Sequence, residues 1–157
     1  MNGFLVACAC GIALGMGHLS FAAGDVTVAL SRAGYWEVKN SPRRVVSMNP
    51  GWEFSLDGFR TSKAVNLPHC IDEGEIGYEA SGCVNRQQAA WYRKRFAWAR
   101  TRARTFLHFE AIMGKSRVMV NGRVVSEHFG GFLPIHADVT DVLTNGVNEV
   151  EVWCDNS

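Results

Sequence analysis

The chain has 157 residues, of which 47% are hydrophobic and 20% charged, so one globular domain with its own core is expected and a disordered or collagen-like chain is excluded. Its 16 Lys and Arg nearly balance its 15 Asp and Glu, and a formal net charge of +1 argues against nucleic acid as a partner. The 16 glycines and 9 phenylalanines favour a turn-rich sheet protein over a helical bundle.

The N-terminal segment from Phe4 to Ala23 contains no Lys, Arg, Asp or Glu and ends in small residues. Its uninterrupted apolar run, Phe4 to Met16, is shorter than the roughly 20 residues of a membrane-spanning helix. These features predict a signal peptide over residues 1–23 and export to the periplasm or the extracellular space, with the domain proper at residues 24–157. A transmembrane anchor is one alternative, and the segment lacks the basic residues usual at the start of a signal peptide. A lipoprotein signal is the other, because Leu5 to Cys8 resembles a bacterial lipoprotein cleavage box.

Removal of that segment would leave three of the five cysteines, namely Cys70, Cys83 and Cys154. Cys70 and Cys83 have twelve residues between them and stand at the two ends of a loop-like stretch. In an oxidising compartment they are the expected disulfide, with Cys154 left as a buried thiol; three unpaired buried cysteines are the alternative. The chain has no C-x-x-C, and His69 lacks further ligands at zinc spacing, so neither a metal site nor another cofactor is expected.

From Val45 onward, apolar and polar residues alternate with the period of two that is typical of β-strands. The clearest element is a hairpin over Arg117 to Ser126, where Asn121-Gly122 suits the positive φ angles of a type I′ turn. In the strand Trp91 to Trp98, Lys94 stands on the apolar face, where it would lie at an edge or extend its amine past the apolar neighbours. The other predicted strands are Val45 to Met48, Trp52 to Leu56, Ala64 to Leu67, Thr105 to Ala111 and Glu149 to Cys154.

Short strands separated by turns predict an all-β fold, an antiparallel β-sandwich or jelly roll. Only Asp138 to Leu143 is expected to form a helical turn, capped by the Asp138 side chain. The stretch from Pro68 to Ala89 is poor in apolar residues and is expected to be a long surface loop. Its four carboxylates lack the spacing of a calcium loop, so a solvated acidic surface is favoured over a calcium site.

Seven short motifs follow one another between about residue 45 and residue 157: Trp52 to Phe54, Val65 to His69, Ala90 to Phe96, Phe106 to Glu110, Val120 to Gly122, His128 to Pro134 and Asp138 to Thr140. In this order they resemble the N-terminal sugar-binding domain of family 2 glycoside hydrolases, in particular the β-galactosidase group. The resemblance implies a galactose-binding-like, jelly-roll β-sandwich that precedes an immunoglobulin-like domain and a (β/α)8 barrel.

In that family the barrel bears both catalytic glutamates, and neither later domain is expected in these 157 residues. Retaining hydrolysis needs two carboxyl groups about 5 to 5.5 Å apart across the scissile bond. We identify no such pair in this sequence, with Glu53 and Glu110 better read as structural residues. The chain alone is therefore expected to be inactive, with no catalytic residue of its own.

The family's first domain contributes to the rim of the barrel's active site, through the loop that follows a Leu-Pro-His motif. The resemblance thus assigns substrate contact to His69, Cys70 and Asp72. Many relatives have Asp-Trp directly after that motif, whereas this chain has Cys70-Ile71 before Asp72, so the polar contact is lost or displaced. The identity of the sugar is left open.

The expected partners are therefore a galactoside-like carbohydrate, in the context of the full enzyme, and the barrel and immunoglobulin-like domains. Apolar surface that those domains would cover favours self-association of the isolated chain. A free-standing carbohydrate-binding module and a sandwich with a purely structural or interaction role are the alternatives.

Overall fold

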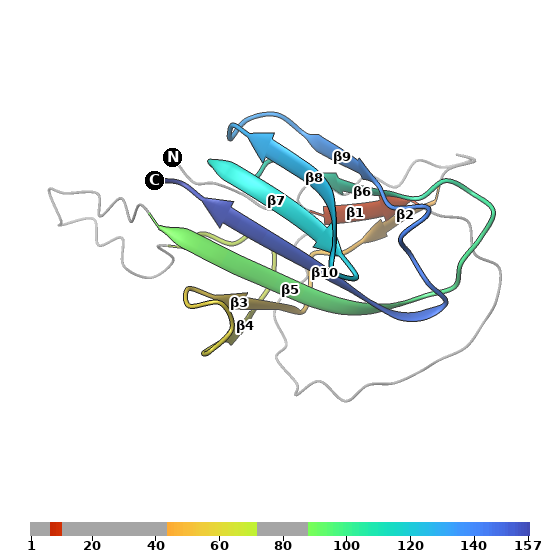
Figure 1. The fold of residues 1–157 in the computed structure, drawn as a ribbon, viewed down its shortest axis with the longest axis horizontal. Coiled ribbons are helices and arrows are strands. Elements are labelled where there is room, and N and C mark those ends of the chain that lie inside the picture. Colours follow the sequence, from red (N-terminus) through yellow and green to blue (C-terminus); the bar gives the residue numbers. More distant parts are fainter. Residues whose placement is uncertain (1–6, 11–43, 72–87) are drawn as a thin grey trace, which may run out of the picture.

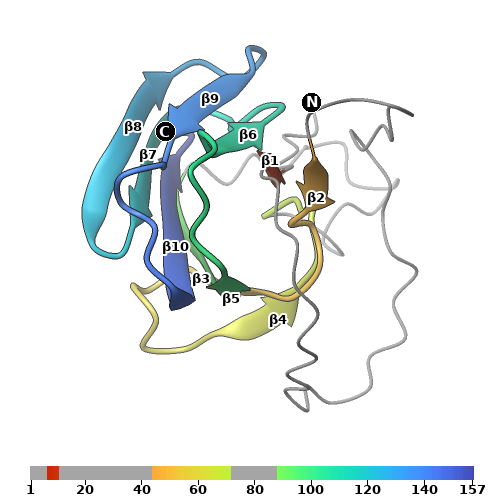
Figure 2. The same cartoon turned by 90° about the vertical axis from the view of Figure 1, so that its right-hand side faces the viewer.

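The computed structural model describes residues 7–10, 44–71 and 88–157, and these residues form ten β-strands and no helix. The strands make two antiparallel sheets that face each other as a sandwich (Figure 1). Seen along the strands, the two sheets lie on opposite sides of a shared interior, with β8 and β9 adjacent where one sheet meets the other (Figure 2). The all-β prediction is confirmed, and the described residues contain no helix long and apolar enough to cross a bilayer.

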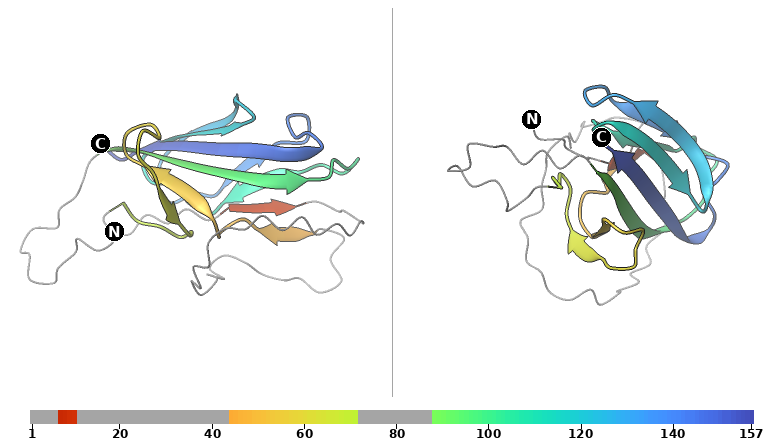
Figure 3. Two further views of the ribbon diagram at one scale, coloured as in Figure 1. Left: turned by 90° about the horizontal axis from the view of Figure 1, so that it is seen from below. Right: turned by 60° about the vertical axis from the view of Figure 1, so that its left-hand side comes forward.

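The larger sheet has six strands in the order β4-β3-β5-β10-β7-β8. Its centre is the pair β5 and β10, which run side by side over ten residues, from Gly146 opposite Trp98 to Asp155 opposite Ala89 (Figure 3). The strands are β3 (Trp52–Ser55), β4 (Lys63–Val65), β5 (Ala89–Trp98), β7 (Lys115–Val120), β8 (Arg123–Phe129) and β10 (Gly146–Asp155).

The smaller sheet has the order β2-β1-β6-β9, with β1 (Ala7–Cys10), β2 (Val45–Ser47), β6 (Phe106–Phe109) and β9 (Ile135–Asp138). β1 falls inside the predicted signal peptide, and its backbone pairs on both sides, with Ala9 opposite Val46 and Leu107. Cleavage after residue 23 stays a prediction, and most of that segment lies outside the described residues. Cleavage would remove β1 and free the facing edges of β2 and β6.

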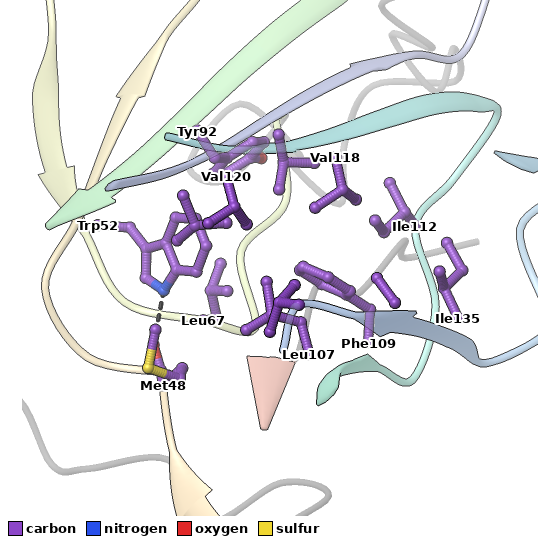
Figure 4. Close-up of a cluster of buried hydrophobic side chains, with 14 of the residues drawn as sticks. Met48, Trp52, Leu67, Tyr92, Leu107, Phe109, Ile112, Val118, Val120 and Ile135 are labelled. Carbon is purple, nitrogen blue, oxygen red and sulfur yellow. Dashed lines mark hydrogen bonds between the residues drawn. The ribbon is translucent and has the colours of Figure 1, made fainter. Parts of the chain in front are cut away.

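The alternation seen in the sequence sorts side chains between the sandwich interior and its surface. On β5, for example, Tyr92 is buried while Arg95 is exposed. Trp52 is fully buried, and its indole Nε1 donates to the Met48 carbonyl at 2.7 Å, which satisfies the polar atom of this large side chain (Figure 4). Other core residues from both sheets include Leu67, Leu107, Phe109, Ile112, Val118, Val120, Val150 and Val152.

The predicted hairpin is confirmed, with φ angles of 50° at Asn121 and 77° at Gly122 between β7 and β8. The turn is also anchored, because the Asn121 side-chain amide donates to the Val142 carbonyl at 2.9 Å and to Asn148 Oδ1 at 2.8 Å. The hairpin is thereby tied to the loop before β10.

Lys94 extends its amine past its apolar neighbours and donates from Nζ to the Pro50 carbonyl. Its burial lowers the pKa of the amine. The Lys94 side chain therefore buries its stem and finds a backbone partner, which accounts for a charged residue on the apolar side of β5.

The expected helical turn is also present, although it is a single turn. Leu143 N donates to the Val139 carbonyl at 3.1 Å, and Asp138 Oδ1 accepts from Thr140 N at 3.1 Å. Asp138 ends β9 and caps this turn as predicted.

Candidate functional site

His69 is buried in the sandwich, with 5% of its surface exposed. Its Nδ1 lies 3.0 Å from the Tyr92 hydroxyl, and the Phe54 ring packs against the imidazole at 4.6 Å between centroids. The preceding Leu67 is fully buried and donates its N–H to the Asn49 carbonyl at 2.8 Å, so the start of the loop is drawn into the core. The prediction of a surface loop that begins at Pro68 is therefore wrong for His69, which is buried.

The other predicted rim residues follow His69 directly. Cys70 is partly exposed and adjoins the buried imidazole in sequence. Asp72 and Cys83 lie outside the described residues, so both the polar sugar contact and the Cys70–Cys83 disulfide stay predictions. Cys154 packs against the core, and burial raises the pKa of its thiol to about 12, as expected for a structural thiol.

One end of the sandwich, which we call the loop end, is where β5 begins and where β8 and β10 finish. Gly114 packs there so tightly that a Cβ on it would lie 1.9 Å from the Asp155 carbonyl oxygen, and its φ is +80°. Its carbonyl accepts from Gly130 N at 3.0 Å. Only glycine suits residue 114, and this contact fixes the segment that leaves β8.

Large apolar side chains protrude from that segment. Phe129, Phe132 and Leu133 are 77%, 74% and 65% exposed, and we call these three residues the Phe132 patch. The neighbouring Gly131 packs against Met113, since a Cβ on Gly131 would lie 2.6 Å from Met113 Sδ and this flexible side chain would have to shift. The segment after β8 is therefore closely packed through its glycines and presents apolar residues to solvent. Exposed apolar surface of this kind marks an interaction site.

An open depression of about 540 Å³ adjoins Phe129 on the outer face of the larger sheet. Its lining includes Lys115, Arg117, Glu127 and the partly exposed Trp153. Arg117 donates to Glu127 at 2.7 Å, and the second cation of this floor, Lys115, interacts electrostatically with Asp155. Aromatic surface beside polar groups can bind a sugar ring by stacking and hydrogen bonding. Sequence reasoning missed this site, because Trp153 resembled an ordinary outward residue of the last strand.

A protein-family model described as "Glycosyl hydrolase 2 galactose-binding domain-like" matches residues 77–157, just over half of the chain. The chain belongs to this family. The resemblance found in the sequence motifs is thereby confirmed, and the sandwich is a galactose-binding-like domain of family 2 glycosidases.

The curated relatives of this galactose-binding-like domain are much longer proteins. A Formosa agariphila protein named "Putative beta-glucuronidase" is 25% identical over 157 residues, which cover 90% of this chain and 18% of that protein. A β-galactosidase of Thermoanaerobacter pseudethanolicus is 29% identical over 101 residues, covering 63% of this chain and 13% of the enzyme. The chain thus spans less than a fifth of the length of these relatives.

Solved structures show the same fold. A β-D-glucuronidase of Dictyoglomus thermophilum aligns with a TM-score of 0.58 and 26% identity over 69% of this chain and 19% of that chain. A Ruminococcus gnavus β-glucuronidase aligns with a TM-score of 0.64 over 77% of this chain and 22% of that chain, and at 24% identity it supports the fold alone.

In the galactose-binding-like domain, four described carboxylates form ion pairs: Glu53, Glu127, Asp138 and Glu149. Glu53 accepts from Arg93 at 2.6 Å, and Glu149 accepts from Arg95 at 2.8 Å. Glu151 lies opposite Arg93 in register, and burial together with the nearby Glu149 raises its pKa. These groups lie along a sheet face, where cross-strand ion pairs hold neighbouring strands in place.

Proposed function

We propose that this chain is the non-catalytic sugar-binding domain of an exported family 2 glycosidase, in which its loop end forms part of the active-site rim. The observation that carries the proposal is the Phe132 patch, which protrudes from the loop end between tightly packed glycines. His69 lies toward the same end, because it contacts Tyr92 near the start of β5. His69 and the Phe132 patch, which belong to two of the family motifs, therefore lie toward one end of the sandwich.

The chemistry of hydrolysis belongs to the longer enzyme in this proposal. Retaining glycosidases place an acid and a nucleophilic carboxylate about 5 to 5.5 Å apart, and the sugar must be held accurately between them. A rigid sandwich that docks through exposed apolar side chains can fix rim residues against the substrate. His69 would then act as a positioning residue, because its buried ring anchors the chain that leads to Cys70 and Asp72.

The substrate class that fits is a β-linked hexoside, neutral or uronic. The relatives named above are a β-galactosidase and proteins named as β-glucuronidases. Lys115 beside Trp153 supplies a cation and an aromatic surface of the kind that suits a uronate. Both sugar types belong in any assay of the longer enzyme.

Export follows from the predicted signal peptide at residues 1–23 and places the enzyme in the periplasm or outside the cell. The test is the N-terminus of the protein recovered from the exporting host. Mass spectrometry that finds a chain beginning near residue 24 supports export, whereas an intact Met1 in the cell extract contradicts it.

The rim proposal is tested in the longer enzyme that contains this domain. Phe132→Ser alters the patch at the loop end, and Val124→Ser is the matched control, because Val124 is also exposed, at 51%, but lies beside the hairpin at the opposite end. We expect Phe132→Ser to lower kcat/KM by about tenfold or more and Val124→Ser to leave it within about twofold. Equal effects of the two substitutions would show that the patch has no special relation to the active site.

The depression at Trp153 favours a second function, a free-standing carbohydrate-binding module. In that case the isolated chain should bind galactose or glucuronate in a calorimetric titration, and Trp153→Ala should abolish the binding. If the isolated chain binds neither sugar and Phe132→Ser lowers kcat/KM of the longer enzyme, the rim function is supported and the binding-module function is contradicted.

A further inference from the structure

Two histidines face each other across the smaller sheet, on the side away from the core. His108 on β6 and His136 on β9 are directly opposite in register, and their Nδ1 atoms lie 3.2 Å apart. Their rings lie side by side, with centroids 4.5 Å apart. The alternate residues Leu107 and Ala137 are buried, which places both imidazoles on the outer face.

The separation of the two nitrogens matches that of two ligands on one metal ion. Imidazole nitrogens bind zinc at about 2.0 to 2.1 Å, so two such bonds to atoms 3.2 Å apart enclose an angle of about 100°. This angle falls between the roughly 90° of tetragonal sites and the roughly 109° of tetrahedral ones. We propose that His108 and His136 form a two-histidine site for a divalent transition metal of the Zn²⁺, Ni²⁺ and Cu²⁺ class.

A neutral imidazole offers the nitrogen lone pair that a metal ion binds. Burial lowers the pKa of His108, the facing His136 lowers it further, and Glu110 acts in the opposite direction. With both rings neutral, one Nδ1–H can donate to the other Nδ1. Metal binding through both Nδ1 atoms would require each ring to carry its proton on Nε2. The ring that donates from Nδ1 would therefore transfer that proton to its own Nε2, and no proton would be released to solvent.

Water completes the coordination in this proposal. The described residues contain no group of three or more His, Cys, Asp and Glu side chains arranged to hold a metal, so the protein supplies two ligands. The nearby Asp138 is already engaged, because it accepts from Arg104 at 2.6 Å and from the Thr140 hydroxyl at 2.6 Å.

The consequence of occupancy would be a clamp between two strands. The two histidines are 28 residues apart in sequence and come together only when β6 pairs with β9. A metal that binds the folded state and not the unfolded chain raises stability by mass action. The site would therefore strengthen the smaller sheet without any part in hydrolysis.

The test uses the 157-residue chain without a histidine tag, titrated with Ni²⁺ in a calorimeter at about pH 7.5, where imidazoles are neutral. We expect one Ni²⁺ to bind, His136→Asn to abolish that binding, and Ni²⁺ to raise the thermal unfolding temperature of the original chain but not of this variant. His136 is exposed, so the variant should fold, and its melting curve without metal checks this. The cysteines are the same in both chains, so the difference isolates the histidine pair.

Asp138→Asn is the matched control, since Asp138 lies on the same strand as His136 but is engaged by Arg104 and Thr140 and is no ligand in this proposal. This substitution should leave Ni²⁺ binding unchanged. Binding should also weaken as the pH falls, because protons compete with the metal ion for the imidazole lone pairs. Ni²⁺ binding that is the same in His136→Asn as in the original chain, or no binding by the original chain, would overturn the proposal.

Discussion

The imidazole Nδ1 of His69 lies 3.0 Å from the hydroxyl oxygen of Tyr92, and both rings pack against Phe54. Three elements meet in this contact: β3 supplies Phe54, β5 supplies Tyr92, and the segment after β4 supplies His69. The loop that we propose for the active-site rim therefore starts from a fixed point in the core. Its first residue has a structural task that can be measured separately from catalysis.

Replacing His69 by Ala should destabilise the isolated domain by about 1 to 3 kcal/mol, because a buried aromatic contact and the hydrogen bond between His69 and the Tyr92 hydroxyl are lost. Tyr92→Phe removes the hydroxyl but keeps the ring, so it should cost about 1 kcal/mol. Urea unfolding of the three chains measures both differences. A change below about 0.5 kcal/mol for His69→Ala would place His69 among surface residues after all.

Two phenylalanines provide a contrast between core and patch. Phe109 has no exposed surface, whereas Phe132 is 74% exposed. Phe109→Ala should cost roughly 3 to 5 kcal/mol through lost burial and the cavity left behind, while Phe132→Ala should stay within about 0.5 kcal/mol. Equilibrium urea curves for both variants would show the difference, and similar losses for the two would mean that the Phe132 patch packs in the folded domain.

Stability in acid should depend on Asp138. Hydrogen bonds from Thr140 and Arg104 lower its pKa from 3.8 to about 2. Between these values the unfolded carboxyl group binds more protons than the folded one, so its contribution is present above about pH 4 and is lost as the pH falls toward about 2.

In the variant Asp138→Asn, the side-chain amide oxygen can still accept a hydrogen bond from Thr140, but the side chain has no ionisable group. It should be less stable than the original chain at about pH 5, and the two chains should converge as the pH approaches about 2. Urea melts across this range provide the measurement. A stability difference that does not vary with pH would show that the Asp138 charge has no part in it.

Removal of residues 1–23 should weaken the smaller sheet. β1 pairs with β2 on one side and with β6 on the other, so its loss leaves two unpaired strand edges that can pair with another chain. We expect the shortened chain to unfold at lower urea concentration and to self-associate in sedimentation experiments. If the shortened chain is monomeric and as stable as the full chain, β1 contributes nothing to the domain.

Local patterns were sufficient for most of the larger sheet. Alternation of apolar residues predicted β5 and β10, and Asn121-Gly122 predicted the turn between β7 and β8, because these signals depend on the residues next to them. The order of the motifs was sufficient to recognise the family. The rest of the site depends on contacts between distant parts of the chain.

His69 illustrates that dependence. A histidine after Pro68 at the start of a polar stretch suggests a surface loop, and its burial comes from the Leu67–Asn49 backbone bond and from rings on β3 and β5. His108 and His136 each fall on an outward position, but only the register of β6 against β9 brings them together. The pairing of Ala7–Cys10 with β2 and β6 could not be predicted either, because an apolar run that favours a signal peptide is also compatible with a β-strand.

The central claim is that this domain serves hydrolysis without performing it. The most direct measurement is the rate at which the purified 157-residue chain releases product from chromogenic β-galactosides and β-glucuronides. Glu53, Glu127, Asp138 and Glu149 are engaged in ion pairs, and both catalytic glutamates are expected in the barrel, so the rate should equal that of buffer alone. Turnover well above the buffer blank, and lost in Glu151→Gln, the carboxyl group whose raised pKa most resembles that of an acid catalyst, would contradict the account.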